Sequence, residues 1–249
     1  MRRFVIRPDA IAAGRVRFDA DEAHHLARVL RLRPGALVEA SDAVGRVFTV
    51  RIEALGRGEA WGSILGEAPA SRESPCAITL AQGILKGERM TWLVQKATEL
   101  GVARLVPLET ARVVARAPTE GAGARQSRWE RVAREAVKQC GRGVVPVVEA
   151  PRGFGAVLAE AAAHDATWLC WEGGGRPLAT LAREAGRVRR ILLLVGPEGG
   201  FTDDEVAQAR AAGARLGGLG PRILRAESAG LVALALCQHL FGDLGSGPA

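Results

Sequence analysis

Residues 192–205, LLLVGPEGGFTDDE, limit the fold most strongly, because an unbroken apolar run ends there in a glycine-rich loop that opens onto a predicted helix. A strand with apolar residues at every position is typical of a parallel sheet that is covered on both faces. Thr202 and Glu205 have the spacing of a capping box, which predicts where the helix begins. The pattern therefore predicts an α/β sheet with a loop of the kind at which ligands bind.

The charge that follows the glycines narrows the ligand class. Residues 203–205 are Asp, Asp and Glu, so negative charge already occupies the helix N-terminus, where a phosphate would otherwise bind. This pattern disfavours a nucleoside triphosphate and favours a neutral or cationic ligand, such as an adenosine that carries a sulfonium. From this loop alone, a tight structural turn without a ligand is an equal alternative.

Strand and helix patterns alternate from residue 76 onward, which predicts a parallel α/β domain. We expect strands near 77–82, 103–107, 145–149, 166–171, 190–195 and 214–219, and helices near 88–100, 127–140, 176–185, 202–212 and 227–241. Ser127 and Glu130 form a second capping box. Residues 116–126 and 245–249 are predicted to be mobile. The last helix is apolar on nearly every side, so it is predicted to be buried or to lie at a subunit interface.

The first 66 residues have a different pattern, with short β-like segments and one helix. Phe48, Val50 and Ile52 alternate with polar residues, and a further strand is predicted around residues 61–65. The helix begins with a capping signal at residues 19–22, and Leu26, Val29 and Leu30 are predicted to form its apolar stripe. Residues 66–75 lack periodicity and are rich in Pro, Ser and charge, which predicts a linker between two domains.

The positive charge is concentrated in one segment. The 249-residue chain has 48% hydrophobic residues, enough for a sizeable core, and a formal charge of +7 with a pI near 10.2. Residues 125–142 alone carry a net charge of +4. This excess predicts contact with a polyanion such as RNA, with a solvated helix surface as the alternative.

Cysteine spacing and hydropathy exclude two further classes. The four cysteines are widely separated and have no metal-ligand spacing, so we expect reduced, mostly buried thiols and no metal site. The chain has neither the apolar core of a signal peptide nor a run of roughly 20 apolar residues that could span a membrane. These features predict a cytoplasmic protein without membrane association.

A second loop, residues 219–229, follows the last predicted strand and contains Arg222, Arg225 and Glu227. It should lie at the same sheet edge as the glycine loop, so the two loops could frame one pocket. The arginines could hold a phosphate or carboxylate, and the glutamate could accept a proton. A surface salt bridge is the structural alternative.

The two loops resemble motifs of a known protein family. GPEGGFTDDE at 196–205 and LGPRILRAESA at 219–229 resemble motifs of the bacterial 16S rRNA (uracil-N3)-methyltransferases of the SPOUT superfamily. Further similarities follow in the family's order: HHL and VLR within 24–31, QKATELGV at 95–102, and a group that includes Gln139, Arg142 and Pro146. The resemblance covers nearly the whole chain.

The resemblance implies a small N-terminal PUA-like β-barrel that binds RNA, residues 1–72, and a C-terminal SPOUT methyltransferase domain, residues 73–249. In the second domain it implies a parallel sheet with helices on both faces and a deep trefoil knot, an exception to the rule that chains do not thread themselves. The implied cofactor is S-adenosylmethionine, and the implied partners are 16S rRNA in the 30S subunit and a second copy of the chain. The target is N3 of a uridine, expected at rRNA position 1498, which must leave its stack before transfer.

Roles for individual residues also come from the resemblance. Glu227 is the candidate base for the N3 proton, and Arg225 and Arg222 offset developing negative charge; no nucleophilic residue is needed. The expected cofactor-binding residues are Trp171, Glu172, Gly173, Leu194, Val195, Gly196, Glu198, Gly199, Gly200, Leu219, Gly220, Ile223 and Leu224. The expected RNA-binding residues are Arg2, Arg3, His25, Arg28, Arg31, Lys86, Lys96, Arg112, Arg131, Lys138, Gln139 and Arg142.

One departure and two alternatives accompany this hypothesis. Ala226 stands where many relatives have a threonine, which removes a hydroxyl from the pocket edge. The chain could instead be a non-catalytic RNA-binding ribosome assembly factor, or a SPOUT methyltransferase acting on another rRNA or tRNA position. A dinucleotide oxidoreductase is disfavoured, because no GxGxxG motif follows the first strand of the α/β part.

Overall fold

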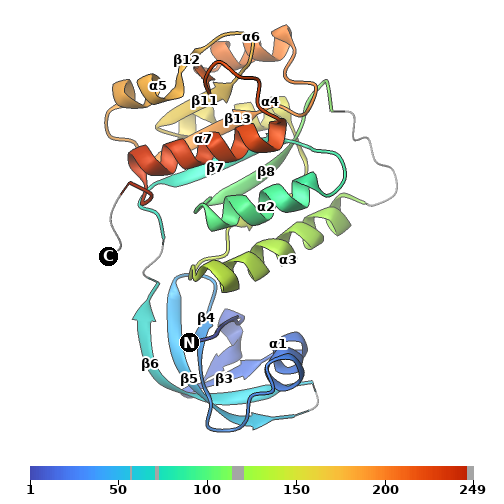
Figure 1. Cartoon of the computed structure of the whole chain (residues 1–249), viewed down its shortest axis with the longest axis vertical. Helices are drawn as coiled ribbons and strands as arrows, with labels where there is room; N and C mark the ends of the chain where they lie inside the picture. The colour runs from blue at the N-terminus through green and yellow to red at the C-terminus, as the bar shows by residue number, and fades with distance from the viewer. Residues whose placement is uncertain (57, 71–72, 114–120, 246–249) are drawn as a thin grey trace. The chain divides into compact units, whose positions relative to one another are not determined.

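The computed structural model describes residues 1–245 except 57, 71–72 and 114–120 (Figure 1). The chain divides into two compact units, one formed by Met1–Glu73 with Val137–Val145 and the other by Ser74–Ala136 with Pro146–Ala249. Within the described ranges, no helix combines the length and the apolar character needed to cross a membrane. No cluster of His, Cys, Asp and Glu suited to a metal ion occurs among the same residues.

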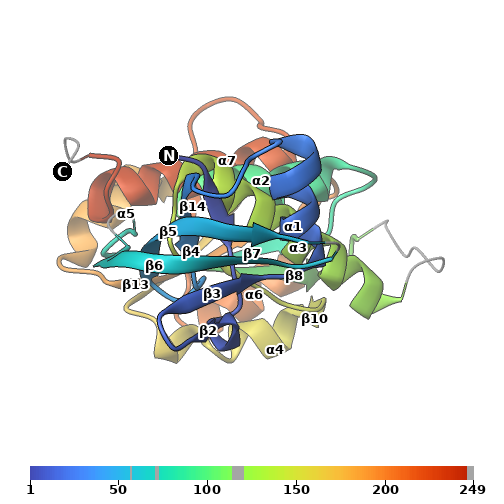
Figure 2. The ribbon, with the colours of Figure 1, turned by 90° about the horizontal axis from the view of Figure 1, so that it is seen from below.

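The first unit contains a six-stranded mixed sheet in the order β1-β4-β5-β6-β3-β2. β1 pairs with β4 in parallel, whereas the other pairs are antiparallel. Figure 2 shows β5, β6, β3 and β2 side by side in this order. The predicted alternation of Phe48, Val50 and Ile52 is confirmed, because all three are buried in the core of this unit. The strands are β1 (Arg3–Val5), β2 (Ile11–Ala12), β3 (Arg15–Phe18), β4 (Leu37–Ser41), β5 (Arg46–Leu55) and β6 (Ala60–Pro69).

The helix of the first unit begins as predicted but is shorter. Asp19 caps α1 (Ala20–His24) by accepting a hydrogen bond from the Glu22 N–H. A π-helical turn, His25–Val29, follows. Its wider turn changes the directions of the side chains, so Leu26 is buried whereas Val29 is 62% exposed, and the predicted apolar stripe was wrong at Val29. The predicted linker was also wrong at its start, because β6 continues to Pro69.

The second unit contains the predicted parallel α/β sheet, in the order β10-β8-β7-β13-β11-β14-β12 with β9 paired to β8. Every pair in this sheet is parallel. The strands are β7 (Ala77–Gly83), β8 (Arg104–Glu109), β9 (Val147–Val148), β10 (Arg152–Gly153), β11 (Ala166–Cys170), β12 (Arg176–Pro177), β13 (Arg190–Val195) and β14 (Arg215–Gly218). The helices are α2 (Arg89–Glu99), α3 (Ala122–Cys140), α4 (Phe154–Leu158), α5 (Leu178–Ala185), α6 (Asp203–Ala211) and α7 (Ala226–Phe241); the last residues of α3, from Val137, belong to the first unit.

Helices cover both faces of this sheet, which explains the unbroken apolar run in β13. Leu192 and Leu194 pack in one core cluster with residues of α4 and α6. Alternation along a strand directs Leu193 to the opposite face, where α7 contacts β7 and β13. In Figure 1, α2 and α7 lie in front of the strands. A strand in this position needs an apolar residue at every site.

α3 differs most from its prediction. It begins at Ala122, so the predicted Ser127–Glu130 capping box was wrong and both residues lie inside the helix. Gln126 Nε2 donates to Glu130 Oε1 (3.0 Å) and to the Val148 carbonyl (3.1 Å), contacts that the extra turn provides. Of the predicted mobile loop, residues 122–126 are therefore helical, whereas 116–120 lie outside the described residues, as does most of the predicted tail.

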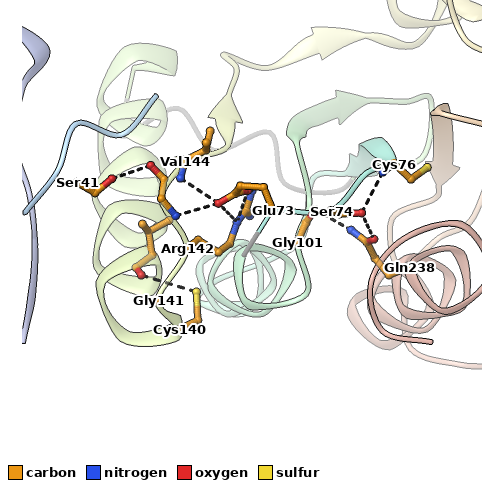
Figure 3. A network of polar contacts seen from close by, with 12 residues as sticks. Ser41, Glu73, Ser74, Cys76, Gly101, Cys140, Gly141, Arg142, Val144 and Gln238 are labelled. Carbon is orange, nitrogen blue, oxygen red and sulfur yellow. Dashed lines mark hydrogen bonds and ion pairs between the residues drawn. The ribbon is translucent and has the colours of Figure 1, made fainter. Parts of the chain in front are cut away.

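α7 is buried along one side, and its polar residue there is satisfied. Gln238 is fully buried; its Nε2 donates to the Gly101 carbonyl (2.8 Å), and its Oε1 accepts from Ser74 Oγ (2.6 Å) (Figure 3). These bonds join α7 to the C-terminal end of α2 and to the start of the unit. On α7, Val232 and Leu240 are each 37% exposed. The predicted burial of the last helix is thus confirmed for one side only.

Candidate functional site

A cavity of about 580 Å³ lies in the second unit at the carboxyl ends of β11, β13 and β14. It is lined by the glycine loop after β13, by the loop and first helical turn after β14, and, at the end of β11 and just after it, by Cys170, Trp171, Glu172, Gly174 and Gly175. The two loops singled out in the sequence, at 196–205 and 219–229, therefore line one pocket, as predicted.

The sheet register explains why these three segments meet. β11 lies between β13 and β14, and Cys170 pairs with Val195 on one side and with Gly217 on the other. The three strands consequently end at the same level, and the chain leaves each of them at the same sheet edge. The Trp171 N–H donates to the Gly217 carbonyl (3.2 Å), which continues this contact past the strand end. Crevices at the carboxyl ends of parallel strands are the usual ligand sites of such sheets.

The glycine loop is folded too tightly for larger residues. Gly200 has a φ of +68° and its N–H donates to the Pro197 carbonyl (2.9 Å), which closes a turn. A Cβ on Gly200 would lie 2.5 Å from Glu172 Oε1, and a Cβ on Gly196 would lie 3.1 Å from the Gly200 backbone. Glycine at these positions lets a ligand approach the backbone.

At the start of α6, side chains of the helix and its capping residue accept hydrogen bonds from the backbone N–H groups. The Glu205 N–H donates to Thr202 Oγ1 (3.2 Å) and the Thr202 N–H donates to Glu205 Oε2 (2.9 Å), which confirms the predicted capping box. Glu205 Oε1 also accepts from the Ala111 N–H (2.8 Å). Carboxylates therefore already occupy the helix N-terminus, which agrees with the expectation that a phosphate is disfavoured there.

Glu227 occupies the first turn of α7 and lines the pocket. Its side chain is 12% exposed, and its Oε1 lies 3.9 Å from Arg89 Nε. Its Oε2 is buried and accepts no hydrogen bond from any described residue. A buried carboxylate oxygen without a donor is costly, so this oxygen can readily accept a hydrogen bond or a proton from a ligand. Arg222 and Arg225 also line the pocket and are exposed.

Arg89 is a pocket residue that the sequence analysis missed. It begins α2, six positions after the end of β7, and its Nη1 donates to Glu198 Oε1 (3.2 Å). The Lys86 N–H donates to the same oxygen (3.1 Å). A basic residue at the start of the helix that follows a strand of the parallel sheet is the signal that could have identified it. Other lining residues outside the prediction are Cys170, Gly174, Gly175, Pro197, Gly217, Gly218, Pro221, Ala226 and Ala229.

Most of the expected cofactor-binding residues lie at the pocket, but three do not line it. Leu194 belongs to the core with α4 and α6. Gly199 turns its carbonyl towards Arg112, whose Nη1 donates to it (3.1 Å), and a Cβ on Gly173 would meet the Trp171 ring. The lining residues are Trp171, Glu172, Val195, Gly196, Glu198, Gly200, Leu219, Gly220, Ile223 and Leu224.

The expected RNA-binding residues of the first unit fall into two groups. Arg2, Arg28, Arg31 and Gln139 are exposed. Four others make contacts within the unit, and Arg142 is the most buried of these. Its Nη2 donates to Glu73 Oε2 (2.8 Å), while Glu73 Oε1 accepts from the Gly143 and Val144 N–H groups (Figure 3). The remaining contacts are Arg3 with Glu39 and the Gly141 carbonyl, Lys138 with Glu22, and the His25 ring with Phe4.

In the second unit, Lys86, Arg112 and Arg131 are exposed, whereas Lys96 forms an ion pair with Glu99 (2.8 Å). The basic run 125–142 is thus not one uniform charged surface. Arg131 and Arg134 are exposed, whereas Lys138 and Arg142 at its end belong to the first unit and form ion pairs with Glu22 and Glu73 of that same unit.

Three of the four thiols are buried, as predicted, and none forms a disulfide among the described residues. Burial raises the pKa of Cys76 to about 11 and that of Cys170, which lines the pocket, to about 12. A thiol with so high a pKa is a poor nucleophile at neutral pH.

Comparisons with known proteins identify similar chains over nearly the full length. Residues 72–238 match the RNA methyltransferase domain family, and residues 18–65 match the RNA methyltransferase PUA domain family. Ribosomal RNA small subunit methyltransferase E of Synechocystis sp. is 34% identical over 241 residues, covering 96% of this chain and 78% of the relative. The Bacillus subtilis protein of the same name is 28% identical over 224 residues and covers 88% of both chains.

A solved structure is also similar to this chain over nearly its whole length. The crystal structure of ribosomal RNA small subunit methyltransferase E from Neisseria gonorrhoeae, bound to S-adenosyl methionine, aligns with a TM-score of 0.84 at 34% identity. The alignment covers 98% of this chain and 99% of that structure.

Proposed function

Because this chain belongs to the ribosomal RNA small subunit methyltransferase E family, we propose that it transfers a methyl group from S-adenosylmethionine to N3 of a uridine in 16S rRNA of the 30S subunit. The single observation that carries this proposal is the pocket in which the glycine loop, the Arg222–Arg225 loop and Glu227 meet. Each element has a separate part in the chemistry.

The residues present fit the methyl donor. The cavity volume lies within the range of small-molecule sites, and Gly196 and Gly200 line it with backbone that no side chain covers. Glu172, Glu198 and Glu227 line the pocket, so carboxylates are available near a positively charged sulfonium. When bound, S-adenosylmethionine supplies an electrophilic methyl carbon. The protein needs to hold donor and acceptor in line, which requires positioning rather than a protein nucleophile.

The acceptor nitrogen must lose its proton. Glu227 is the proposed base, because Oε2 lacks a hydrogen-bond donor while the side chain lines the pocket. A proton taken from N3 would move onto this oxygen, and the negative charge left on the uracil ring would be offset by the Arg222 and Arg225 guanidinium groups. The uracil must leave its base pair and its stack to enter the pocket.

The domain assignment is part of the proposal. We assign residues 1–72 to a PUA-like RNA-binding domain and residues 73–249 to the methyltransferase domain with a C-terminal trefoil knot. The match of residues 18–65 to the RNA methyltransferase PUA domain and the mixed sheet of the first unit support the first assignment. The proposed RNA contacts are the exposed predicted residues, Arg2, Arg28, Arg31, Lys86, Arg112, Arg131 and Gln139.

The protein is also proposed to act in the cytoplasm as a homodimer. A substrate in the small ribosomal subunit supports the location. Val232 and Leu240, two exposed apolar residues of α7, support a subunit contact at that helix. Sedimentation measurements would test it, because a monomer at micromolar concentration would contradict a dimer.

A methyl-transfer assay tests the proposed function. The protein is incubated with labelled S-adenosylmethionine and 30S subunits that lack the modification, and the product is mapped by nuclease digestion and mass spectrometry. We expect one labelled 3-methyluridine in 16S rRNA. A methyl group on a ribose or on tRNA would indicate a methyltransferase of other specificity, and 30S binding without uptake of the donor would indicate an assembly factor.

A further inference from the structure

Arg89 links two acidic residues that come from different loops of the pocket. Its Nη1 donates to Glu198 Oε1 (3.2 Å) in the glycine loop, and its Nε lies 3.9 Å from Glu227 Oε1 in the first turn of α7. The Arg89 side chain is 44% exposed, so it reaches the pocket from solvent. One guanidinium group thus lies beside both the proposed donor-binding loop and the proposed base.

The contact to Glu198 is part of a wider attachment of the glycine loop to the end of β7. The Lys86 N–H also donates to Glu198 Oε1 (3.1 Å), and the fully buried Gln82 donates through Nε2 to the Gly196 carbonyl (3.0 Å). The loop is therefore held at its first residue by a buried amide and at its third by Arg89 and a backbone N–H. Among the described residues, Arg89 supplies the only positive charge in these three bonds, and it lies opposite the Glu198 carboxylate.

The contact to Glu227 distinguishes the two oxygens of that carboxylate. Oε1 faces the Arg89 cation, whereas Oε2 is buried without a donor among the described residues. A cation on one side of a carboxylate favours one orientation of the side chain, which leaves the second oxygen for a ligand. At 3.9 Å the two groups attract each other without forming a hydrogen bond, so Arg89 orients the Glu227 side chain and leaves its carboxylate able to accept a hydrogen bond from a ligand.

We infer that Arg89 is a positioning residue with two separate effects: through Glu198 it holds the glycine loop in the shape that binds the methyl donor, and through Glu227 it keeps Oε2 presented to N3 of the uracil. This inference rests on the proposed function for the identity of the donor and for the role of Glu227. It predicts that Arg89 acts on donor affinity and on turnover through different partners.

Calorimetric titration with S-adenosylmethionine tests the first effect. An ion pair of this exposure predicts that Arg89→Gln weakens donor binding about three- to fivefold. In a Glu198→Gln background the same substitution should change the Kd less than twofold, because its partner charge is already gone. Arg187→Gln, an exposed arginine near the opposite end of β13, is the matched control and should leave the Kd unchanged.

Turnover on 30S subunits tests the second effect. Arg89→Gln should lower kcat several-fold when Glu227 is present and should lower it no further in a Glu227→Gln background. Additive losses in both double variants would overturn the inference, since Arg89 would then act independently of its two partners. If the wild type binds the donor but methylates no RNA, the proposed function fails, while the affinity cycle still decides the Glu198 effect. If the wild type takes up no donor, both fail.

Discussion

Gly83, the last residue of β7, lies so close to the glycine loop that a larger residue would collide with it, and Gly83→Ala therefore gives a sharp prediction. The added Cβ would lie 2.3 Å from Pro197 N, 2.5 Å from Pro197 Cδ and 2.7 Å from Gly196 C. Carbon atoms without a bond between them are at their optimum near 3.5–4.0 Å, so the glycine loop would have to move by about 1 Å. The obstructing atoms belong to backbone and to a proline ring, which cannot rotate away.

The expected cost follows from this displacement. Overpacking of this kind costs about 1–3 kcal/mol, and the upper part of the range is expected because backbone must move. The loop that moves contains Gly196 and Gly200, so affinity for S-adenosylmethionine should fall at least about tenfold. Urea unfolding gives the first quantity and calorimetric titration gives the second.

Gly155→Ala is the matched control. Gly155 is exposed in α4, and an added Cβ would have no atom within 4 Å. This variant should keep its donor affinity and gain up to about 0.5–1 kcal/mol of stability, because alanine is favoured over glycine in a helix. If Gly83→Ala bound the donor as tightly as the wild type, the glycine loop would not be fixed by its contact with β7, and the reasoning would be refuted.

Three further predictions concern the base, the RNA surface and a charged network. Glu227→Gln should lower kcat at least about a hundredfold while the donor Kd changes less than threefold; an equal loss of both would reject its role as base. Arg131→Gln with Arg134→Gln should weaken 30S binding and reduce its salt dependence, measured by filter binding at several salt concentrations; an unchanged slope would contradict RNA contact there. Hydrogen bonds from Arg104, supported by Arg152, lower the pKa of Glu160 to about 2 from the usual 4.5. The ionised Glu160 carboxylate therefore stabilises the fold fully above pH 4.5, and this stabilisation is lost as the pH falls towards 2. Glu160→Gln should lower the free energy of unfolding by about 1 kcal/mol at pH 7 and should weaken its dependence on pH below pH 4.5, both measured by urea unfolding.

The sequence predicted most elements of the second unit because their signals are local. The apolar run of β13 and the Thr202–Glu205 capping box are read from neighbouring residues, and both are confirmed. The start of α3 was missed for the opposite reason. Ser127 and Glu130 have the spacing of a capping box, but α3 already begins at Ala122. Gln126, in the added turn, donates a hydrogen bond to the Val148 carbonyl, 22 positions away. Local sequence preferences predict the ends of a helix only weakly, and tertiary contacts of this kind override them.

The charged run 125–142 shows the same limit for function. Its net charge predicted an RNA surface, and the sequence contains nothing that separates the exposed Arg131 from the buried Arg142. The difference depends on Glu73, which lies 69 positions earlier and whose carboxylate holds Arg142 and two backbone N–H groups. A charge count cannot find such a partner, because ion pairs form between residues that the fold brings together.

By itself, the sequence determined the α/β class, the two loops that meet at the pocket and the family resemblance, since each is written in consecutive residues. Only the tertiary structure decided which charges surround the pocket. Arg89 and Glu198 are 109 positions apart, and they meet because β7 and β13 are neighbours in the parallel sheet. Strand order depends on how all the apolar faces pack at once, and short-range periodicity contains no information about it.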